Sequence, residues 1–233
     1  MTRHDAVGRV TNAATPDLFE IEGDQPGATP VQHALAPGAT LFRALARPHA
    51  AVLLTDLQCV LEQAPLRHMT TSGGFRMSVA MTNCGLLGWV SDGAGYRYID
   101  KDLDSGRRWP SMPASFRELA TRSAALAGFH DFEPDACLVN RYEPGARLTL
   151  HQDRNERDFT QPIVSISLGL PAVFIFGGTK RAGNAMQIQL THGDVVVWGG
   201  PSRLRYHGVL ALKDGQHPLV GRHRINLTFR RAA

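Results

Sequence analysis

Apolar and polar residues alternate in short runs through the second half of the chain, from about residue 136 onward. A period of two is typical of β-strands that bury one face, because successive side chains point to opposite sides of a sheet. Turn-forming pairs such as Pro144-Gly145 and Gly177-Gly178 separate the runs. The pattern predicts about eight strands, at residues 136–142, 146–152, 162–170, 172–176, 185–190, 194–198, 202–207 and 224–230.

The first half of the chain has a different pattern. Apolar residues at helical spacing predict helices at 50–64 and 114–127, and a short alternating segment predicts a strand at 39–46. Between the helices, residues 66–112 interleave glycines with aromatic residues and arginines. This composition favours a flexible lid whose rings stack on a flat ligand. The alternative is a hairpin that packs its own aromatic rings on the core.

These elements together predict a mainly β fold with flanking helices. Short antiparallel strands at this spacing favour a double-stranded β-helix (jelly roll), preceded by the lid. Residues 1–38 are rich in Pro, Gly, Ala and Thr and are expected to be a flexible N-terminal arm. We expect an N-terminal extension with the helices and the lid at 39–135 and a jelly-roll core at 136–233. These two parts would form one integrated catalytic domain, at about 39–233.

The last predicted strand has an unusual polar face. Ile225, Leu227 and Phe229 share one side of it, and the other side carries Arg224, Asn226, Thr228 and Arg230. If that side lies inside the barrel, unpaired arginines there would be very costly. Arginine binds carboxylates in a bidentate fashion, so two inward arginines indicate an anionic guest such as a dicarboxylate. The alternative is an edge strand whose polar face lies in water.

His151-Gln152-Asp153 is the most informative motif. Alternate residues of a strand share a face, so His151 and Asp153 can reach one metal ion, and His207 can approach from a distant strand. Two imidazoles and one carboxylate that leave coordination positions open are typical of non-heme Fe(II) oxygenases. A His-x-Asp pair alone is common, and most such pairs bind no metal. The paired arginines of the last strand favour the metal interpretation.

Composition and charge limit the classes of protein to which the chain could belong. The chain has 233 residues, of which 43% are hydrophobic and 20% charged, which is ordinary for one globular domain. Its net charge of +4 and its pI of about 9.2 fit a polyanionic partner such as nucleic acid. The three cysteines lack CxxC spacing and favour a reducing compartment. No secretory or transmembrane segment is recognisable, so we expect a cytoplasmic monomer that does not bind membranes.

Several longer segments closely resemble the bacterial branch of the AlkB family. They are His151-Gln152-Asp153 and residues 162–171, 193–200, 202–208 and 226–230, with further likeness at 77–85 and 135–142. The resemblance covers roughly residues 65 to 231. It implies an Fe(II)- and 2-oxoglutarate-dependent dioxygenase that reverses alkylation damage. It further implies demethylation of N1-methyladenine and N3-methylcytosine in DNA, with RNA as a further candidate, and release of formaldehyde, succinate and CO2.

The resemblance also implies a role for individual positions, and it makes the lid a nucleotide-recognition lid. The implied iron ligands are His151, Asp153 and His207. The implied 2-oxoglutarate contacts are Asn140, Tyr142, Arg224 (distal carboxylate), Asn226 and Arg230 (near the C1 carboxylate). The implied substrate contacts are Thr71, Met81, Trp89 (which sandwiches the flipped base with His151), Tyr96, Asn155 and Arg181 (a gate over the base pocket).

Two positions depart from the family pattern. Phe75 stands where relatives usually carry a tyrosine, which removes a hydroxyl that could contact a phosphate. Asn155 stands where relatives often carry an acid, so it brings no charge to a cationic base. The reaction is expected to be intact, whereas the ranking of substrates is open.

Three alternatives remain at this stage. One is a 2-oxoglutarate oxygenase that acts on a protein side chain or a small molecule. Another is a nucleic-acid-binding module that keeps the barrel without turnover. The third is a metal-binding cupin without cosubstrate, which would leave Arg224 and Arg230 unexplained. Succinate formation that depends on 2-oxoglutarate separates the first from the last.

Overall fold

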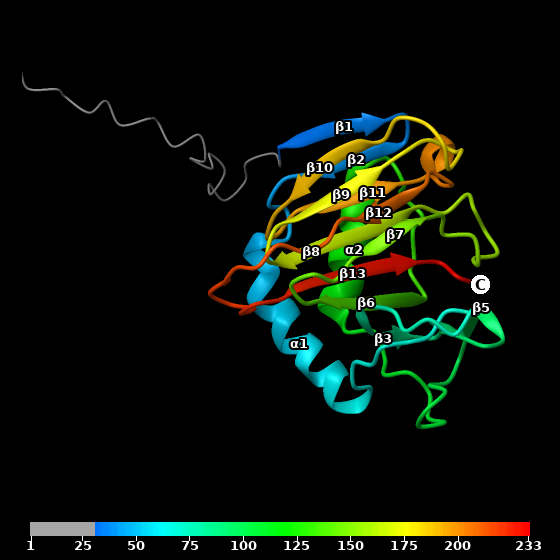
Figure 1. The fold of residues 1–233 in the computed structure, drawn as a ribbon. Helices are drawn as coiled ribbons and strands as arrows, with labels where there is room; N and C mark the ends of the chain where they lie inside the picture. Colours follow the sequence, from blue (N-terminus) through cyan, green and yellow to red (C-terminus); the bar gives the residue numbers. More distant parts are fainter. Residues whose placement is uncertain (1–30) are drawn as a thin grey trace, which may run out of the picture.

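Two antiparallel sheets face each other in the computed structural model, which describes residues 31–233 (Figure 1). The large sheet has seven strands. In spatial order they are β1 (Gln32–Ala36), β2 (Ala39–Phe42), β11 (Val195–Trp198), β8 (Ile163–Gly169), β13 (Arg224–Arg230), β6 (Ala136–Tyr142) and β3 (Ala80–Gly85).

The small sheet has four strands, and a separate hairpin has two. The small sheet runs in the order β10 (Met186–Leu190), β9 (Ala172–Phe176), β12 (His207–Val209) and β7 (Leu148–His151). The hairpin consists of β4 (Gly88–Asp92) and β5 (Gly95–Ile99). The predicted mainly β fold with flanking helices is therefore confirmed.

Two helices cover the outer face of the large sheet (Figure 1). Helix α1 (Ala50–Gln63) follows the short 3-10 helix η1 (Arg47–His49) and buries Leu53, Leu57 and Val60 at helical spacing. Helix α2 (Ala114–Leu126) begins directly after Pro113, whose fixed φ suits a helix start. Both helices pack on the apolar side chains of β8, β11 and β13. No helix in the described range 31–233 is long and apolar enough to cross a membrane.

Strand β13 lies at the centre of the large sheet, between β8 and β6. Its apolar residues Ile225, Leu227 and Phe229 belong to the core beneath the helices. Successive side chains alternate across a sheet, so the four polar residues of β13 face the small sheet. All four are buried, including both arginines. The predicted inward polar face is confirmed, and the edge-strand alternative is wrong.

Four elements differ from the sequence prediction, and one of them is β3, which lies within the predicted lid at 66–112 but forms an edge of the large sheet. Residues 32–36 were assigned to the N-terminal arm, but they form β1, which pairs with β2 at the edge of the large sheet; residues 1–30 of that arm lie outside the described residues. The strand predicted at 39–46 ends at Phe42, and the chain turns at Ala44, which has a positive φ. The strand predicted at 202–207 begins only at His207, because Pro201 starts the 3-10 helix η2 (Gly200–Ser202).

Candidate active site

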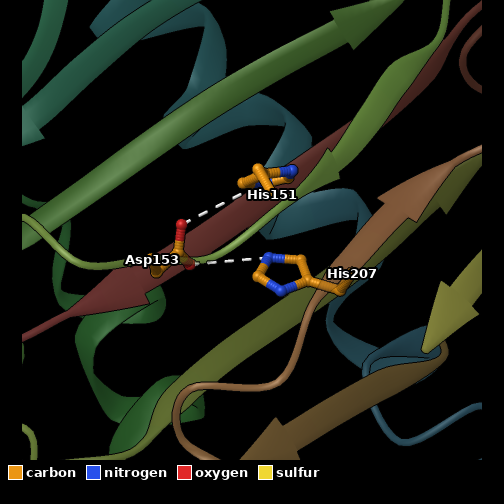
Figure 2. Close-up of side chains that lie close together, drawn as sticks. All are labelled: His151, Asp153 and His207. Atoms are coloured by element: carbon orange, nitrogen blue, oxygen red, sulfur yellow. Dashed lines mark ion pairs between the residues drawn. The ribbon is translucent and has the colours of Figure 1, made fainter. Parts of the chain in front are cut away.

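The predicted metal ligands converge at one end of the small sheet (Figure 2). His151 ends β7 and His207 begins β12, and the two are direct partners in the register of these strands. Asp153 follows β7 by two residues, and its carboxylate oxygens lie 3.8 Å from Nε2 of His151 and 3.7 Å from Nε2 of His207. One donor atom from each residue lies within 4.8 Å of the others. This is the only such group of three in the part of the chain that the structure describes.

Both imidazole rings are oriented by backbone carbonyls. The Nδ1 atom of His151 lies 2.8 Å from the Thr149 carbonyl oxygen, and that of His207 lies 3.0 Å from the Arg205 carbonyl oxygen. A carbonyl oxygen can only accept, so each Nδ1 is the donor, and in the neutral ring Nε2 is then the atom available to a metal. Burial, followed by the nearby His151, lowers the pKa of His207 to about 4, so its ring is neutral at pH 7. The donor set fits an Fe(II) ion.

Asp153 is held in its charged form by a buried arginine. Arg230 donates from Nε (3.0 Å) and Nη2 (2.7 Å) to one Asp153 oxygen. Burial alone would raise the pKa of Asp153, but Arg230 and the two histidines hold it well below its usual range. The resemblance assigned Arg230 to the C1 carboxylate of 2-oxoglutarate. Its contacts in this structure are with Asp153 and Glu156, so it also orients a metal ligand.

Arg224 is the second buried arginine, and its guanidinium is mostly unpaired. Nη2 donates to the Ser167 hydroxyl at 3.0 Å, and the group lies 5.0 Å from the centre of the Tyr142 ring. Within residues 31–233, its Nε and Nη1 find no hydrogen-bond partner. Burial lowers the pKa of this guanidinium. Donors left unpaired at such a cost indicate a site for an anion.

Amide side chains line the space between the two sheets next to Arg224. Asn140 on β6 and Asn226 on β13 are direct partners in register, and Nδ2 of Asn140 donates to Oδ1 of Asn226. Asn226 in turn donates to the Ser165 hydroxyl and accepts from Thr228. The Oδ1 atom of Asn140 has no partner among the described residues. The five predicted cosubstrate residues are therefore brought together on β6 and β13.

The hairpin presents two stacked aromatic rings next to the metal motif. Trp89 and Tyr96 stack with ring centres 5.5 Å apart and planes 10° from parallel. Asn155 connects them to the barrel, since its Oδ1 accepts from Nε1 of Trp89 and its Nδ2 donates to the Tyr96 carbonyl. Tyr96 is partly exposed, at 44%. The segment is thus a hairpin that packs Trp89 against the core, as the second interpretation predicted, while stacking on a ligand stays a prediction.

The remaining predicted substrate residues are less closely tied to the triad. Met81 is buried on β3, opposite Asn140 in register. Thr71 lies in the turn before β3 and is half-buried. Arg181 is exposed between β9 and β10, and within the described residues it forms no hydrogen bond or ion pair with the triad.

Sequence reasoning missed a buried network beneath the triad. Glu156 accepts from the Tyr98 hydroxyl (2.7 Å) and from Nη2 of Arg203 (3.0 Å), and it lies 3.4 Å from Nε of Arg230. Arg203 also donates to the Asp153 carbonyl. The network therefore connects the hairpin to both a metal ligand and Arg230. The feature of the sequence that could have indicated this network is Glu156, an acidic residue three positions after Asp153.

Comparisons with known proteins agree with this geometry. A family model described as "2OG-Fe(II) oxygenase superfamily" matches residues 38–230. The "Alpha-ketoglutarate-dependent dioxygenase AlkB" of Salmonella typhimurium is 54% identical over 217 residues, which cover 93% of this chain and 98% of the relative. The Escherichia coli protein of the same description is 55% identical over 205 residues, which cover 88% and 95%. A solved structure described as "The structure of OsALKBH1" aligns with a TM-score of 0.74 and 27% identity over 86% of this chain and 100% of that one.

Proposed function

The chain belongs to the AlkB family of Fe(II)- and 2-oxoglutarate-dependent dioxygenases, and we propose that it demethylates N1-methyladenine and N3-methylcytosine in DNA. RNA is a further candidate substrate. The products would be the repaired base, formaldehyde, succinate and CO2. The observation that carries the proposal is the metal triad lying in the same inter-sheet space as a buried, unpaired arginine.

His151, Asp153 and His207 are the residues that would hold Fe(II). The two Nε2 atoms that face the Asp153 carboxylate, and the charged form of that carboxylate, support this assignment. Fe(II) bound here together with 2-oxoglutarate supplies the oxidation of an N-methyl group by O2. Arg230 keeps Asp153 charged and fixed, which is a positioning role.

Arg224 would bind the distal carboxylate of 2-oxoglutarate. Its two unpaired donors match the two oxygens of a carboxylate, and the ion pair would remove the cost of the buried charge. Asn140, Asn226 and Tyr142 would hydrogen-bond to the rest of the cosubstrate. Ser165 and Thr228 already fix the Asn226 amide, which in turn accepts from Asn140, so little side-chain entropy would be lost on binding.

The stacked pair on the hairpin would hold the damaged base. A base within a duplex cannot reach a buried centre, so it must be flipped out, which costs a few kcal/mol and less for a lesion that has lost its pairing. N1-methyladenine and N3-methylcytosine carry the methyl group on the pairing edge, so they fit this requirement. Stacking on Trp89 would offset about 1–3 kcal/mol of the cost. The hairpin would also exclude water from the reacting groups.

The proposal also covers the oxidant, the oligomeric state and the location of the enzyme. We expect O2 as the oxidant, and a monomeric enzyme that needs no membrane. Cys59, Cys84 and Cys137 are free in the structure, which supports a reducing, cytoplasmic location.

The test is formaldehyde release from an oligonucleotide that carries a single N1-methyladenine, with Fe(II), 2-oxoglutarate and ascorbate. We expect release from the wild type, none from His207→Ala, and unchanged release from His130→Ala, which removes an exposed histidine. Succinate without formaldehyde from the wild type would indicate a competent centre with a different substrate. No product of either kind from the wild type would refute the proposal.

A further inference from the structure

Two histidines stack on each other near the start of β13. His192 lies in the turn before β11, and His217 lies in the strap, which we define as residues 213–222 between β12 and β13. Their ring centres are 4.4 Å apart and their planes are 30° from parallel. Both side chains are half-buried, and neither belongs to the metal triad. The stack therefore connects the strap to the body of the barrel.

Each of the two rings accepts a hydrogen bond from a backbone amide. Nδ1 of His192 accepts from the amide of Gly169, the last residue of β8, at 3.0 Å. Nδ1 of His217 accepts from the amide of Leu219, within the strap, at 3.2 Å. An N–H group can only donate, so a ring that is protonated at Nδ1 loses this hydrogen bond. The stacked pair therefore requires two neutral imidazoles.

The charges around the pair also oppose protonation. Burial, followed by His217 and Arg47, lowers the pKa of His192 below 6.5. Burial also lowers the pKa of His217. Asp194 acts on His192 in the opposite direction, but its carboxylate already accepts from Arg43 at 2.7 Å. Both rings are therefore neutral at pH 7, and they become cations only as the pH falls further.

The strap is held in shape by bonds of its own. Asp214 forms two hydrogen bonds with Arg222, of 3.1 and 2.7 Å, so its charge is not available to a protonated His217. His217 and Gly221 exchange two backbone hydrogen bonds, of 2.9 and 2.8 Å. These bonds do not depend on the histidine stack. Loss of the stack would therefore free the strap as a unit from the barrel.

The strap leads directly into the strand that carries Arg224. The carbonyl of His223 accepts from the amide of Leu170 at 3.0 Å, and Gly169 pairs with Arg224 in the register of β8 and β13. Gly169 has a φ of +89°, and an added Cβ there would collide with the His223 carbonyl oxygen. The end of β8 and the start of β13 are thus in direct contact at Gly169. Because His192 accepts from that same residue, it fixes the backbone beside Arg224.

We propose that the stack of His192 and His217 is a pH-sensitive latch that positions Arg224 for 2-oxoglutarate. The inference rests on the proposed role of Arg224, since it concerns how tightly that same site holds the cosubstrate. Above about pH 6.5 both rings are neutral, and the latch is closed. Below that pH, protonation breaks the bond to Gly169 and places two cations side by side, so the strap detaches. The start of β13 then loosens, and the affinity for 2-oxoglutarate falls.

The experiment titrates 2-oxoglutarate into the Fe(II) protein under argon in a calorimeter, at about pH 7.5 and about pH 5.5. At the lower pH, we expect the wild type to bind about fivefold more weakly than His217→Gln, the lower end of the usual coupling between two sites. At the higher pH the two should bind equally, because glutamine keeps an acceptor for the Leu219 amide and has no charge. His192→Gln should behave as His217→Gln does.

His130→Gln is the matched control, since it replaces an exposed histidine outside the latch. It should keep the pH dependence of the wild type. Protonation of the iron ligands or of the cosubstrate acts on all four proteins alike, so the difference between the proteins reports the latch. Equal pH dependence of the affinity in the wild type and in both latch variants would overturn the proposal.

A second measurement needs no cosubstrate. Hydrogen exchange of the Gly169 amide is followed in EDTA and corrected for the intrinsic effect of pH on exchange. We expect its protection to fall at the lower pH in the wild type and to persist in His192→Gln. Protection that is independent of pH in the wild type would also overturn the latch. A latch that opens in a protein that binds no 2-oxoglutarate at either pH would refute only the proposed role of Arg224.

Discussion

The unpaired guanidinium of Arg224 predicts that this residue makes the empty protein less stable. Replacing it by methionine, as Arg224→Met, keeps an unbranched side chain of similar length and removes the charge. In the described structure, the Nε and Nη1 atoms have no partner, and leaving two such donors buried costs about 2–6 kcal/mol. The substitution removes that cost.

The variant also loses two favourable contacts. The hydrogen bond to Ser167 contributes about 1 kcal/mol, and the position over the Tyr142 ring contributes about 0.5–2 kcal/mol. The cost that the substitution removes exceeds the contacts that it loses, so the free energy of unfolding of Arg224→Met should be higher than that of the wild type by about 1.5 kcal/mol. For a chain of this size, that corresponds to a rise in Tm of about 3–6 °C.

The assay is urea unfolding in EDTA, followed by the same titration under argon with Fe(II) and 2-oxoglutarate. At about 100 times its Kd, the cosubstrate should stabilise the wild type by about 2.7 kcal/mol and Arg224→Met by nothing measurable. Arg203→Met is the matched control, because Arg203 is equally buried but fully paired. Its loss removes the nearer of the two cations of buried Glu156 and leaves two buried carbonyls without their donor, and it should cost about 3–5 kcal/mol.

The reasoning fails if Arg224→Met in EDTA is less stable than the wild type by more than about 1 kcal/mol, the contribution of one ordinary hydrogen bond. That result would mean that the guanidinium is already satisfied in the empty protein. It also fails if the variant is still stabilised by 2-oxoglutarate.

Three further predictions concern the triad, the hairpin and a distant histidine. Asp153→Ala should abolish formaldehyde release while the circular dichroism spectrum stays unchanged, at a cost of about 1–3 kcal/mol in urea because Arg230 loses the nearer of its two carboxylate partners. Trp89→Ala should lower base repair about tenfold but leave the KM for 2-oxoglutarate unchanged; equal effects would make Trp89 merely structural. Burial, followed by a neighbouring histidine, lowers the pKa of His192 below 6.5, and its Nδ1 accepts from Gly169 N. The unfolded chain therefore binds more protons at His192 than the folded protein does. This contribution to the free energy of unfolding is fully present above about pH 6.5 and declines as the pH falls further. In urea titrations, His192→Gln should make that decline less steep.

The parts of the site that depend on strand periodicity could be predicted from the sequence. The polar residues of β13 alternate with Ile225, Leu227 and Phe229. A period of two decides which face each side chain takes, whatever the rest of the fold does. Asp153, in contrast, lies two residues beyond the end of β7, where Arg230 holds it, so strand alternation does not explain its position. The residue types at these positions then indicated a metal site, from the histidines and the aspartate, and an anion site, from the arginines of β13.

The network around Glu156 could not be predicted in the same way. Its members Tyr98, Glu156 and Arg203 come from the hairpin, the loop after β7 and the segment after η2. Nothing in their local patterns specifies a partner, because the pairing exists only once the two sheets and the hairpin are assembled. The start of β12 was missed for a related reason: Arg203 and Arg205 form side-chain hydrogen bonds with Gln161 and Ser202, and the short helix η2 replaces strand structure there.

The position of β13 has a consequence for biosynthesis. It is the last described strand to leave the ribosome, yet it lies between β8 and β6 at the centre of the large sheet. Until it inserts, its two neighbours have no partner along that edge, and such non-local pairing is slow to form. The strand also carries Arg224 and Arg230. Before β13 inserts, the site therefore lacks both Arg230, which holds Asp153, and Arg224, the candidate anion site.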